Sequence, residues 1–225
     1  MFLINPYILQ ASGNPLWNDL LAYYTADNTP NDALGTYNGT LTNGATYGTG
    51  IINNGFSLDG VNDYVDFGNN LDNDGTNSVS FSCWVYITSV SSFQSIISKM
   101  VSDITGYKIY YSGGYIYFRI SQNNTNAVIK RNDTILSGNT WYHVVVTYDG
   151  SKTAAGVNIY IDDSLATSTI SKDTFTGSSA NAGNLTIAST TNPLGGIIDE
   201  LGIWNRELSA SEVTELYNSG AGLQY

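Results

Sequence analysis

From Trp17 onward, the sequence alternates short runs of β-branched and aromatic residues with turns rich in Gly, Asn, Asp and Ser. Within several runs apolar and polar residues alternate, which is typical of a strand with one buried face. Strands are expected within 20–26, 55–60, 63–68, 79–87, 94–100, 107–121, 140–150, 156–168, 184–189 and 196–205. So many short strands, with little helix between them, predict an all-β fold, a two-sheet antiparallel jelly-roll sandwich. Neither a repeat nor a linker divides residues 17–225, so we expect one domain there.

One short helix is predicted near the end of the chain. Ser209 and Glu212 have the spacing of a capping box, in which each side chain binds a free backbone N–H of the other residue. The apolar positions that follow, spaced i, i+3, i+4, are Val213, Leu216 and Tyr217. They form one stripe that must face the sandwich. Gly220 can supply the left-handed residue that ends the helix.

The charge balance excludes some partners. The chain has 8 basic and 19 acidic residues and a net charge of −11. Nucleic acid is not an expected partner, because phosphate binding needs clustered Lys and Arg. A membrane partner is not expected either, since no apolar stretch is long enough to span a bilayer. An acidic chain can instead hold a hard cation through its oxygen atoms.

Four stretches resemble the laminin G-like, concanavalin A-like jelly-roll family. They are "FSLDGVNDYVDFG", "VSFSCWVYITS", "WYHVVVTYDGSKTAAGVNIYIDDSLATS" and "GGIIDELGIWNRELSASEVTELYNSG". In order and spacing they are similar to the family over roughly residues 18–220. The resemblance implies two antiparallel sheets, often a structural calcium ion, and a role in binding or adhesion. It does not by itself imply an enzyme, because this fold carries lectins and glycoside hydrolases alike.

The resemblance suggests that the first acid of the Asp199-Glu200 pair ties the last strand to an early loop, through calcium or a hydrogen bond. The calcium ligands expected on this basis are Asp27, Asp32 and Asp199, with backbone carbonyls of the 27–39 loop. The alternative is that Asp and Asn in this loop only make turns.

No pattern in the sequence indicates catalysis. Asp199 and Glu200 are neighbours on a strand, so they should point to opposite faces and cannot act as a glycosidase pair. His143 is the only histidine, and no Gly-x-Ser-x-Gly motif accompanies it. We interpret His143 as a packing residue and the single Cys83 as a small core residue. The chain is therefore not expected to be an enzyme.

The hairpin at 107–120 offers a candidate binding surface. If the apolar set of Tyr107, Ile109, Tyr111, Ile116, Phe118 and Ile120 is core, the alternate residues share the outer face. That second set comprises Lys108, Tyr110, Tyr115, Tyr117 and Arg119. Aromatic rings beside cations could stack on sugar rings, or accept an acidic glycan or a protein. The alternative is cross-strand Tyr pairing that only stabilises the sheet.

Residues 1–16 form an irregular apolar segment that looks separate from the sandwich. The apolar side chains Phe2, Leu3, Ile4, Tyr7, Ile8 and Leu9 would expose a hydrophobic patch unless they docked on a partner. The segment lacks the basic start of a signal peptide, and "MFLINPYILQ" resembles the N-termini of some bacteriophage structural proteins. We therefore expect a virion structural or adhesion protein that docks on other virion proteins and binds host-surface glycans or proteins. The alternative is a secreted bacterial carbohydrate-binding module, and a glycan-active enzyme is a third class. The sequence leaves open whether the chain forms a homo-oligomer.

Overall fold

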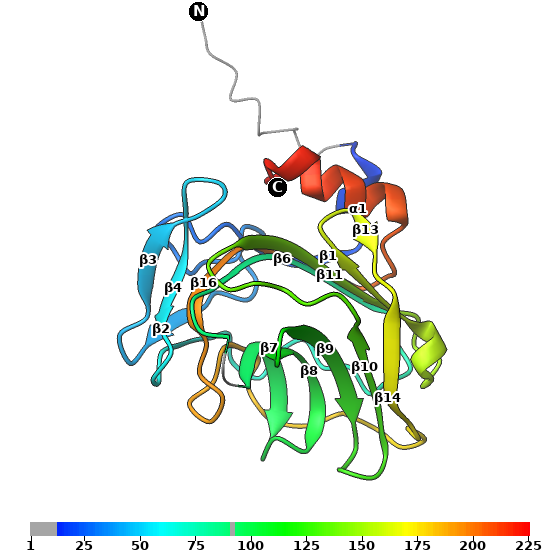
Figure 1. Cartoon of the computed structure of the whole chain (residues 1–225). Coiled ribbons are helices and arrows are strands. Elements are labelled where there is room, and N and C mark those ends of the chain that lie inside the picture. The colour runs from blue at the N-terminus through cyan, green and yellow to red at the C-terminus, as the bar shows by residue number, and fades with distance from the viewer. Residues whose placement is uncertain (1–12, 91–92) are drawn as a thin grey trace, which may run out of the picture.

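The computed structural model describes residues 13–90 and 93–225, which form a sandwich of two eight-stranded sheets (Figure 1). The first sheet has the order β13 (Ser164–Leu165), β12 (Val157–Ile161), β11 (Trp141–Tyr148), β6 (Val79–Ile87), β16 (Gly195–Trp204), β4 (Asn54–Asp59), β3 (Thr46–Thr49), and β1 (Leu20–Tyr24) also pairs with β16. The second sheet has the order β14 (Ser168–Asp173), β10 (Ala127–Asn132), β9 (Tyr115–Ser121), β8 (Thr105–Ser112), β7 (Gln94–Val101), β15 (Thr186–Ile187), β5 (Tyr64–Asp66), β2 (Thr40–Thr42). The strand pairs of both sheets are antiparallel. The predicted all-β fold is confirmed.

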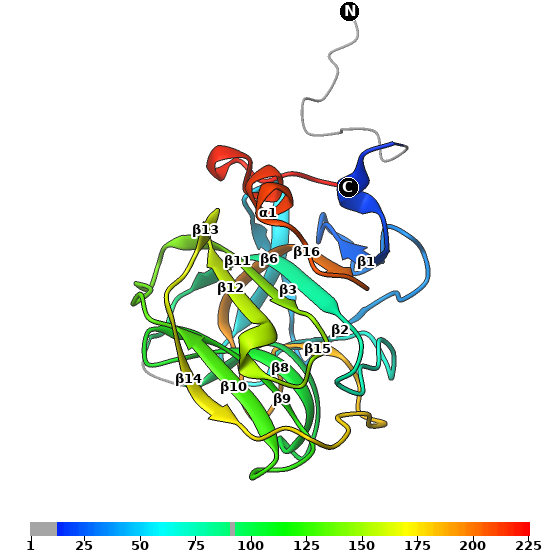
Figure 2. The ribbon, with the colours of Figure 1, turned by 90° about the vertical axis from the view of Figure 1, so that its right-hand side faces the viewer.

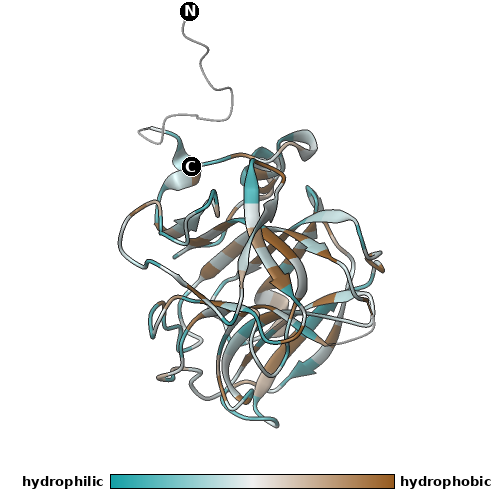
Figure 3. Ribbon diagram, turned by 90° about the vertical axis from the view of Figure 1, so that its left-hand side faces the viewer, coloured by the Kyte–Doolittle hydropathy of each residue, from teal (hydrophilic) through white to brown (hydrophobic). Residues whose placement is uncertain are grey.

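The main core lies between the two sheets, where strands alternate inward and outward side chains. β6 contributes Phe81, Cys83 and Val85, and the facing β8 and β9 contribute Ile109 and Phe118, all at most 1% exposed. Figure 3 shows hydrophobic residues concentrated on the central strands. Burial raises the pKa of the Cys83 thiol to about 12, which keeps it protonated and inert. Both the predicted inward set of the hairpin and the core placement of Cys83 are confirmed.

Some strands lie where the sequence pattern did not predict them. β2 and β3 are short and mostly polar, and they follow the 27–39 loop in a segment where no strand was expected. β10, with the sequence AVIKRN, and the exposed edge strand β14 carry weak alternation. β2, β3 and β14 lie at sheet edges, where pairing with the backbone of a neighbouring strand does not require a buried face. β10 lies between β9 and β14 and buries Ala127 and Val128.

The predicted helix is α1 (Ala210–Tyr217), and it packs on the outer face of the first sheet (Figure 1, Figure 2). Its capping box is present: the Ser209 hydroxyl accepts from the Glu212 N–H, and the Glu212 carboxylate accepts from the Ser209 N–H. Val213 and Leu216 are buried in a second hydrophobic cluster with Trp204 and other residues. The left-handed residue that ends the helix is Asn218 (φ 48°), so the expectation that Gly220 fills this position is wrong.

In the described part of the chain there are also three single 3-10 turns: η1 (Pro15–Trp17), η2 (Ala154–Gly156) and η3 (Asn218–Gly220). η1 brings Leu16 and Trp17 into the second cluster, where the Trp17 ring stacks on Trp204 with 6.1 Å between ring centroids. The Trp204 indole N–H donates to the Leu16 carbonyl. The packed part of the chain therefore includes Leu16, one residue before the expected start of the domain.

Candidate functional site: a groove and an aromatic strip on the second sheet

The outer face of the second sheet carries a row of three aromatic rings. Tyr110 of β8 lies opposite Tyr117 of β9, and their rings stack with centroids 4.7 Å apart and an interplanar angle of 8°. Phe93, just before β7, stacks on the other side of Tyr110 at 4.4 Å. We call Phe93, Tyr110 and Tyr117 the aromatic strip. The hairpin pattern indicated the two tyrosines, whereas Phe93 comes from a segment with no recognisable strand signal.

Two of the five predicted ligand-binding residues are buried, Lys108 beneath this strip and Tyr110 within it. Lys108 is 1% exposed and Tyr110 is 8% exposed. The Lys108 ammonium lies 4.5 Å from the centre of the Phe93 ring and contacts an Asp103 carboxylate oxygen at 2.5 Å. Burial lowers the pKa of Lys108, and the Asp103 contact opposes that shift. Lys108 therefore neutralises Asp103 and supports the strip from below, so it cannot be a direct ligand contact.

The other cations of this face are also engaged. Arg119 is half-buried, and its guanidinium donates to Ser121, to Asn124 and to the Ile104 carbonyl. Arg131 lies over the Tyr115 ring at 4.1 Å and pairs with Asp133 at 3.4 Å. The predicted residues Tyr115, Tyr117 and Arg119 thus share one partly exposed face with Arg131. Lys108 and Arg131 are each paired with a carboxylate, which leaves Arg119 as the one of these three cations without an acidic partner among the described residues, so the face does not favour an acidic glycan.

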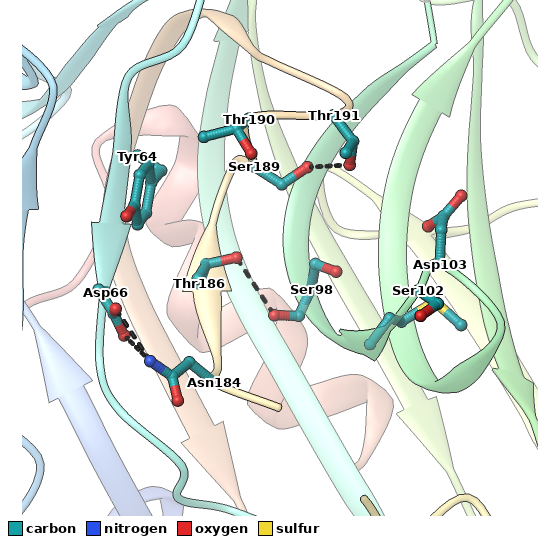
Figure 4. A pocket seen from close by; sticks show the side chains of 11 residues that line it. Tyr64, Asp66, Ser98, Ser102, Asp103, Asn184, Thr186, Ser189, Thr190 and Thr191 are labelled. Carbon is teal, nitrogen blue, oxygen red and sulfur yellow. Dashed lines mark hydrogen bonds between the residues drawn. The ribbon is translucent and has the colours of Figure 1, made fainter. Parts of the chain in front are cut away.

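A polar groove of about 480 Å³ lies next to the strip on the same face (Figure 4). The residues that line it come from β5, β7, β15, the turn after β7 and the loop before β16. They are Tyr64, Asp66, Ser98, Met100, Ser102, Asp103, Asn184, Thr186, Ser189, Thr190 and Thr191. Ser98 is the register partner of Lys108, whose ammonium lies by the Phe93 ring, so the groove lies on the Phe93 side of the strip.

The groove is rich in hydroxyl groups and has an acidic wall. Asn184 donates its amide to both oxygens of Asp66, at 3.0 and 2.9 Å, which fixes that carboxylate at one side of the groove (Figure 4). Asp103 lies at the other side. The hydroxyls of Tyr64 and Ser98 make no hydrogen bond to another described residue and remain available to a ligand. No Lys or Arg is among the lining residues.

The three carboxylates expected to bind calcium do not form one ligand group. Asp32 is 4% exposed and its oxygens accept four backbone N–H groups, those of Tyr23, Leu34, Thr36 and Tyr37. This carboxylate therefore organises its own loop, as the turn interpretation proposed. Within residues 13–90 and 93–225, no three His, Cys, Asp or Glu side chains are arranged to hold a metal ion.

Asp199 does tie the last strand to an early segment, but directly. One of its oxygens accepts the N–H groups of Ile51 and Ile52 at 2.8 and 3.1 Å, and the other accepts that of Glu200. Asp27 likewise accepts the N–H of Asn54 at 3.0 Å. These oxygens are occupied by N–H donors, so the residues present do not fit a calcium ion, and calcium binding stays an untested expectation.

His143 is a packing residue in this structure, buried at 1% exposure beneath α1. Its Nε2 lies 2.8 Å from the Ser82 hydroxyl, and its ring packs against Trp84 and Tyr217. Desolvation lowers its pKa to about 4, which keeps it neutral. Ser82 is 2% exposed, so no substrate can reach this serine–histidine contact.

The predicted partner-docking residues, Phe2, Leu3, Ile4, Tyr7, Ile8 and Leu9, lie outside the described residues. In the part of the chain that is described, no helix has the length and apolar character needed to cross a membrane.

Solved structures with this fold include toxin binding domains. The binding domain of Paraclostridial Mosquitocidal Protein 1 has a TM-score of 0.73 and 17% identity, and the match covers 91% of this chain and 53% of that one. The binding domain of Botulinum neurotoxin DC, solved with rat synaptotagmin II, has a TM-score of 0.71 and 18% identity, covering 91% and 52%. A structure of Botulinum neurotoxin type C, whose cell entry depends on two ganglioside molecules, has a TM-score of 0.69 and 20% identity, covering 93% and 52%.

These identities show a shared fold only, and this chain spans about half the length of each of those toxin chains. The likeness therefore does not assign their receptor binding to the matched half. No curated protein matches the sequence. The family profile of the concanavalin A-like lectin/glucanases superfamily matches residues 59–214, more than half of the chain. The chain belongs to the concanavalin A-like lectin/glucanases superfamily.

Proposed function

We propose that this chain is a non-enzymatic binding module that holds a neutral, hydroxyl-rich glycan in the polar groove of the second sheet. The observation that carries the proposal is the lining of that groove. It combines a fixed carboxylate at Asp66, uncommitted hydroxyls at Tyr64 and Ser98, and no basic side chain.

The chemistry of the groove matches a sugar better than an anion. A carboxylate accepts hydroxyl hydrogen bonds strongly, and hydroxyl side chains can donate and accept in turn. Asp66, which pairs with no Lys or Arg among the described residues, would repel a phosphate or a carboxylated sugar, and the nearby Lys108 charge is already paired with Asp103. The Tyr117 ring on β9, at the end of the strip away from the groove, is partly exposed and offers a flat face to a further sugar ring of a longer glycan.

The side chains best suited to catalysis are engaged elsewhere, which supports a binding role rather than chemistry. His143 and Ser82 are sealed beneath α1, and Asp199 binds backbone N–H groups. The related toxin domains are also described as binding domains, some of them solved with sialic acid or with synaptotagmin.

A glycan array of neutral and sialylated oligosaccharides tests the proposal, with affinities then measured by calorimetry. Asp66→Asn and Tyr64→Ala should each weaken binding at least tenfold, because each removes a group that faces the groove. Asp163→Asn, which makes the same charge change on a remote exposed loop, is the control and should leave the affinity unchanged. Binding that survives both groove variants would reject the groove as the site.

At a finer level, we propose that the module belongs to a virion and docks on it through residues 2–9. The support is the apolar run of that segment, which needs a partner to cover it. A chain lacking residues 2–12 should fold and bind glycan but fail to enter particles, as measured on purified particles by immunoblot. Incorporation of the shortened chain would exclude the anchor and favour a secreted bacterial adhesion module.

A further inference from the structure

Glu200 lies at an irregular point in the central strand β16. The register of β16 against β6 shifts between Asp199 and Gly202, which marks a β-bulge, and Glu200 has a φ of 49°. A non-glycine residue in this conformation costs free energy unless its surroundings hold it. Ile198 and Leu201, on either side of the two acids, both belong to the main core, so the extra residue of the bulge places Asp199 and Glu200 on the other side of the sheet. Both acids are buried there, at 0% and 3% exposure. The expectation that the two side chains point to opposite faces is therefore wrong.

Asp27, Asp199 and Glu200 form what we call the carboxylate cluster. Gln224 bridges two of its members, since its amide nitrogen lies 3.0 Å from an Asp27 oxygen and 3.1 Å from Glu200 Oε1. In residues 13–90 and 93–225, no Lys or Arg pairs with any of the three carboxylates. Asp27 and Asp199 are stabilised by backbone N–H donors instead.

The protons around Glu200 Oε2 can be counted. The Tyr23 hydroxyl oxygen lies 2.5 Å from Glu200 Oε2 and 2.9 Å from the Leu223 carbonyl oxygen. A tyrosine hydroxyl has one proton, and a carbonyl has none. If Tyr23 donates its proton to Glu200, no proton lies between the Tyr23 hydroxyl oxygen and the Leu223 carbonyl oxygen, and these two oxygens repel each other. If Glu200 carries a proton and donates it to Tyr23, then Tyr23 donates to Leu223 and both contacts are hydrogen bonds.

We propose that Glu200 is protonated in the folded protein, and that this proton, rather than a metal ion, stabilises the carboxylate cluster. Through hydrogen bonds, the same proton holds residues 223–225 against β1. The chain of donors runs from Glu200 to Tyr23 and on to the Leu223 carbonyl. Gln224 and the Tyr225 ring, 5.9 Å from the Tyr23 ring, pack over the same place.

The electrostatics of the cluster agree with this proton count. Burial, and then the charges of Asp199 and Asp27, raise the pKa of Glu200 well above its usual value. Burial also raises the pKa of Asp199, to about 7, although three N–H donors lower it. Glu200, which lacks backbone N–H donors to its carboxyl group, is therefore the member that keeps a proton as the pH rises.

The contact between residues 223–225 and β1 should therefore weaken with increasing pH. The folded state holds a proton on Glu200 that the unfolded state releases above the ordinary glutamate pKa of about 4.3. Stability should therefore fall from about pH 5 upward, until Glu200 ionises in the folded protein as well. The first part to loosen should be residues 223–225.

The test is thermal unfolding of the full chain from pH 5 to 9, for the wild type, Glu200→Gln and the matched control Glu215→Gln. The amide of the Glu200→Gln variant can donate to Tyr23 without ionising, so this variant should lose the decline in Tm above pH 7. Below pH 7 part of the decline should remain, because Asp199, with a pKa of about 7, still ionises there. Glu215 is exposed on α1, and its variant should decline like the wild type. Equal slopes for the wild type and Glu200→Gln would overturn the proposal.

A second measurement applies if Glu200→Gln does not fold. The side-chain carboxyl carbon of Glu200, labelled with carbon-13 in the wild type, should show the protonated NMR shift at pH 7. An ionised shift at pH 7 would refute the proposal.

Calcium chloride and EDTA should each leave the wild-type Tm unchanged. A rise with calcium that Asp199→Asn abolishes would show that a cation closes the cluster.

Discussion

At the scale of single residues, carboxylates in this chain act mainly as acceptors for backbone N–H groups. Asp32 gathers four such groups within 3.1 Å, and Asp199 gathers three. The sequence shows that these carboxylates lie in or near loops, and carboxylate oxygens there can bind either calcium or backbone N–H groups. It does not show which donors will face them, because those donors belong to loop backbones whose path depends on the fold. For this reason the sequence could suggest the tie made by Asp199, whereas the structure does not bring the expected calcium ligands Asp27, Asp32 and Asp199 together as one group.

Replacing Asp32 by Ala should destabilise the protein by about 3 kcal/mol, because four backbone N–H groups, one of them buried, lose a charged acceptor at once. Urea unfolding followed by tryptophan fluorescence measures this change. Asp163→Ala, at an exposed loop position, is the control and should change the free energy of unfolding by less than about 0.5 kcal/mol. A small effect at Asp32 would mean that water replaces the carboxylate without loss.

At the scale of elements, the hairpin and the helix were predictable because their signals are local. The turn at Gly113 and Gly114 has two positive φ angles, 58° and 95°, as a two-residue hairpin requires. The capping box of α1 likewise lies within four residues. The groove was not predictable, because it joins residues from 64–66, 98–103 and 184–191, which only the order of strands β7, β15 and β5 brings together.

The capping box gives a prediction for α1. Ser209→Ala should destabilise the protein by about 1 kcal/mol, since the Glu212 N–H loses its acceptor at the start of the helix. Hydrogen exchange of the amides of 210–217 should accelerate with the same variant. Ser211→Ala is the control: it lies inside the helix, where Ala is favourable, so it should be neutral or slightly stabilising. Similar losses for both variants would argue against a capping role for Ser209.

At the scale of the whole molecule, the two ends of the described chain are joined at the centre of the first sheet. β16 lies between β6 and β4 and also pairs with β1, so strands from residues 20–24 and 195–204 are neighbours. Arg206 reinforces this closure: its guanidinium donates to the carbonyls of Pro15 and Leu16 and pairs with Glu212 at 2.6 Å. Such non-local pairing makes the fold depend on its last segment and predicts slow folding.

A chain that ends at Leu194 should therefore fail to fold, because the first sheet loses its central strand and the buried side chains of Ile198, Ile203 and Trp204. Near-ultraviolet circular dichroism and limited proteolysis would show a loss of fixed tertiary structure. Insertion of five flexible residues after Asn124 is the control. That position lies on an exposed turn between β9 and β10, where added length costs little loop-closure entropy. A folded truncated chain would mean that β4 and β6 can pair without β16, and that the closure stabilises the sandwich without defining it.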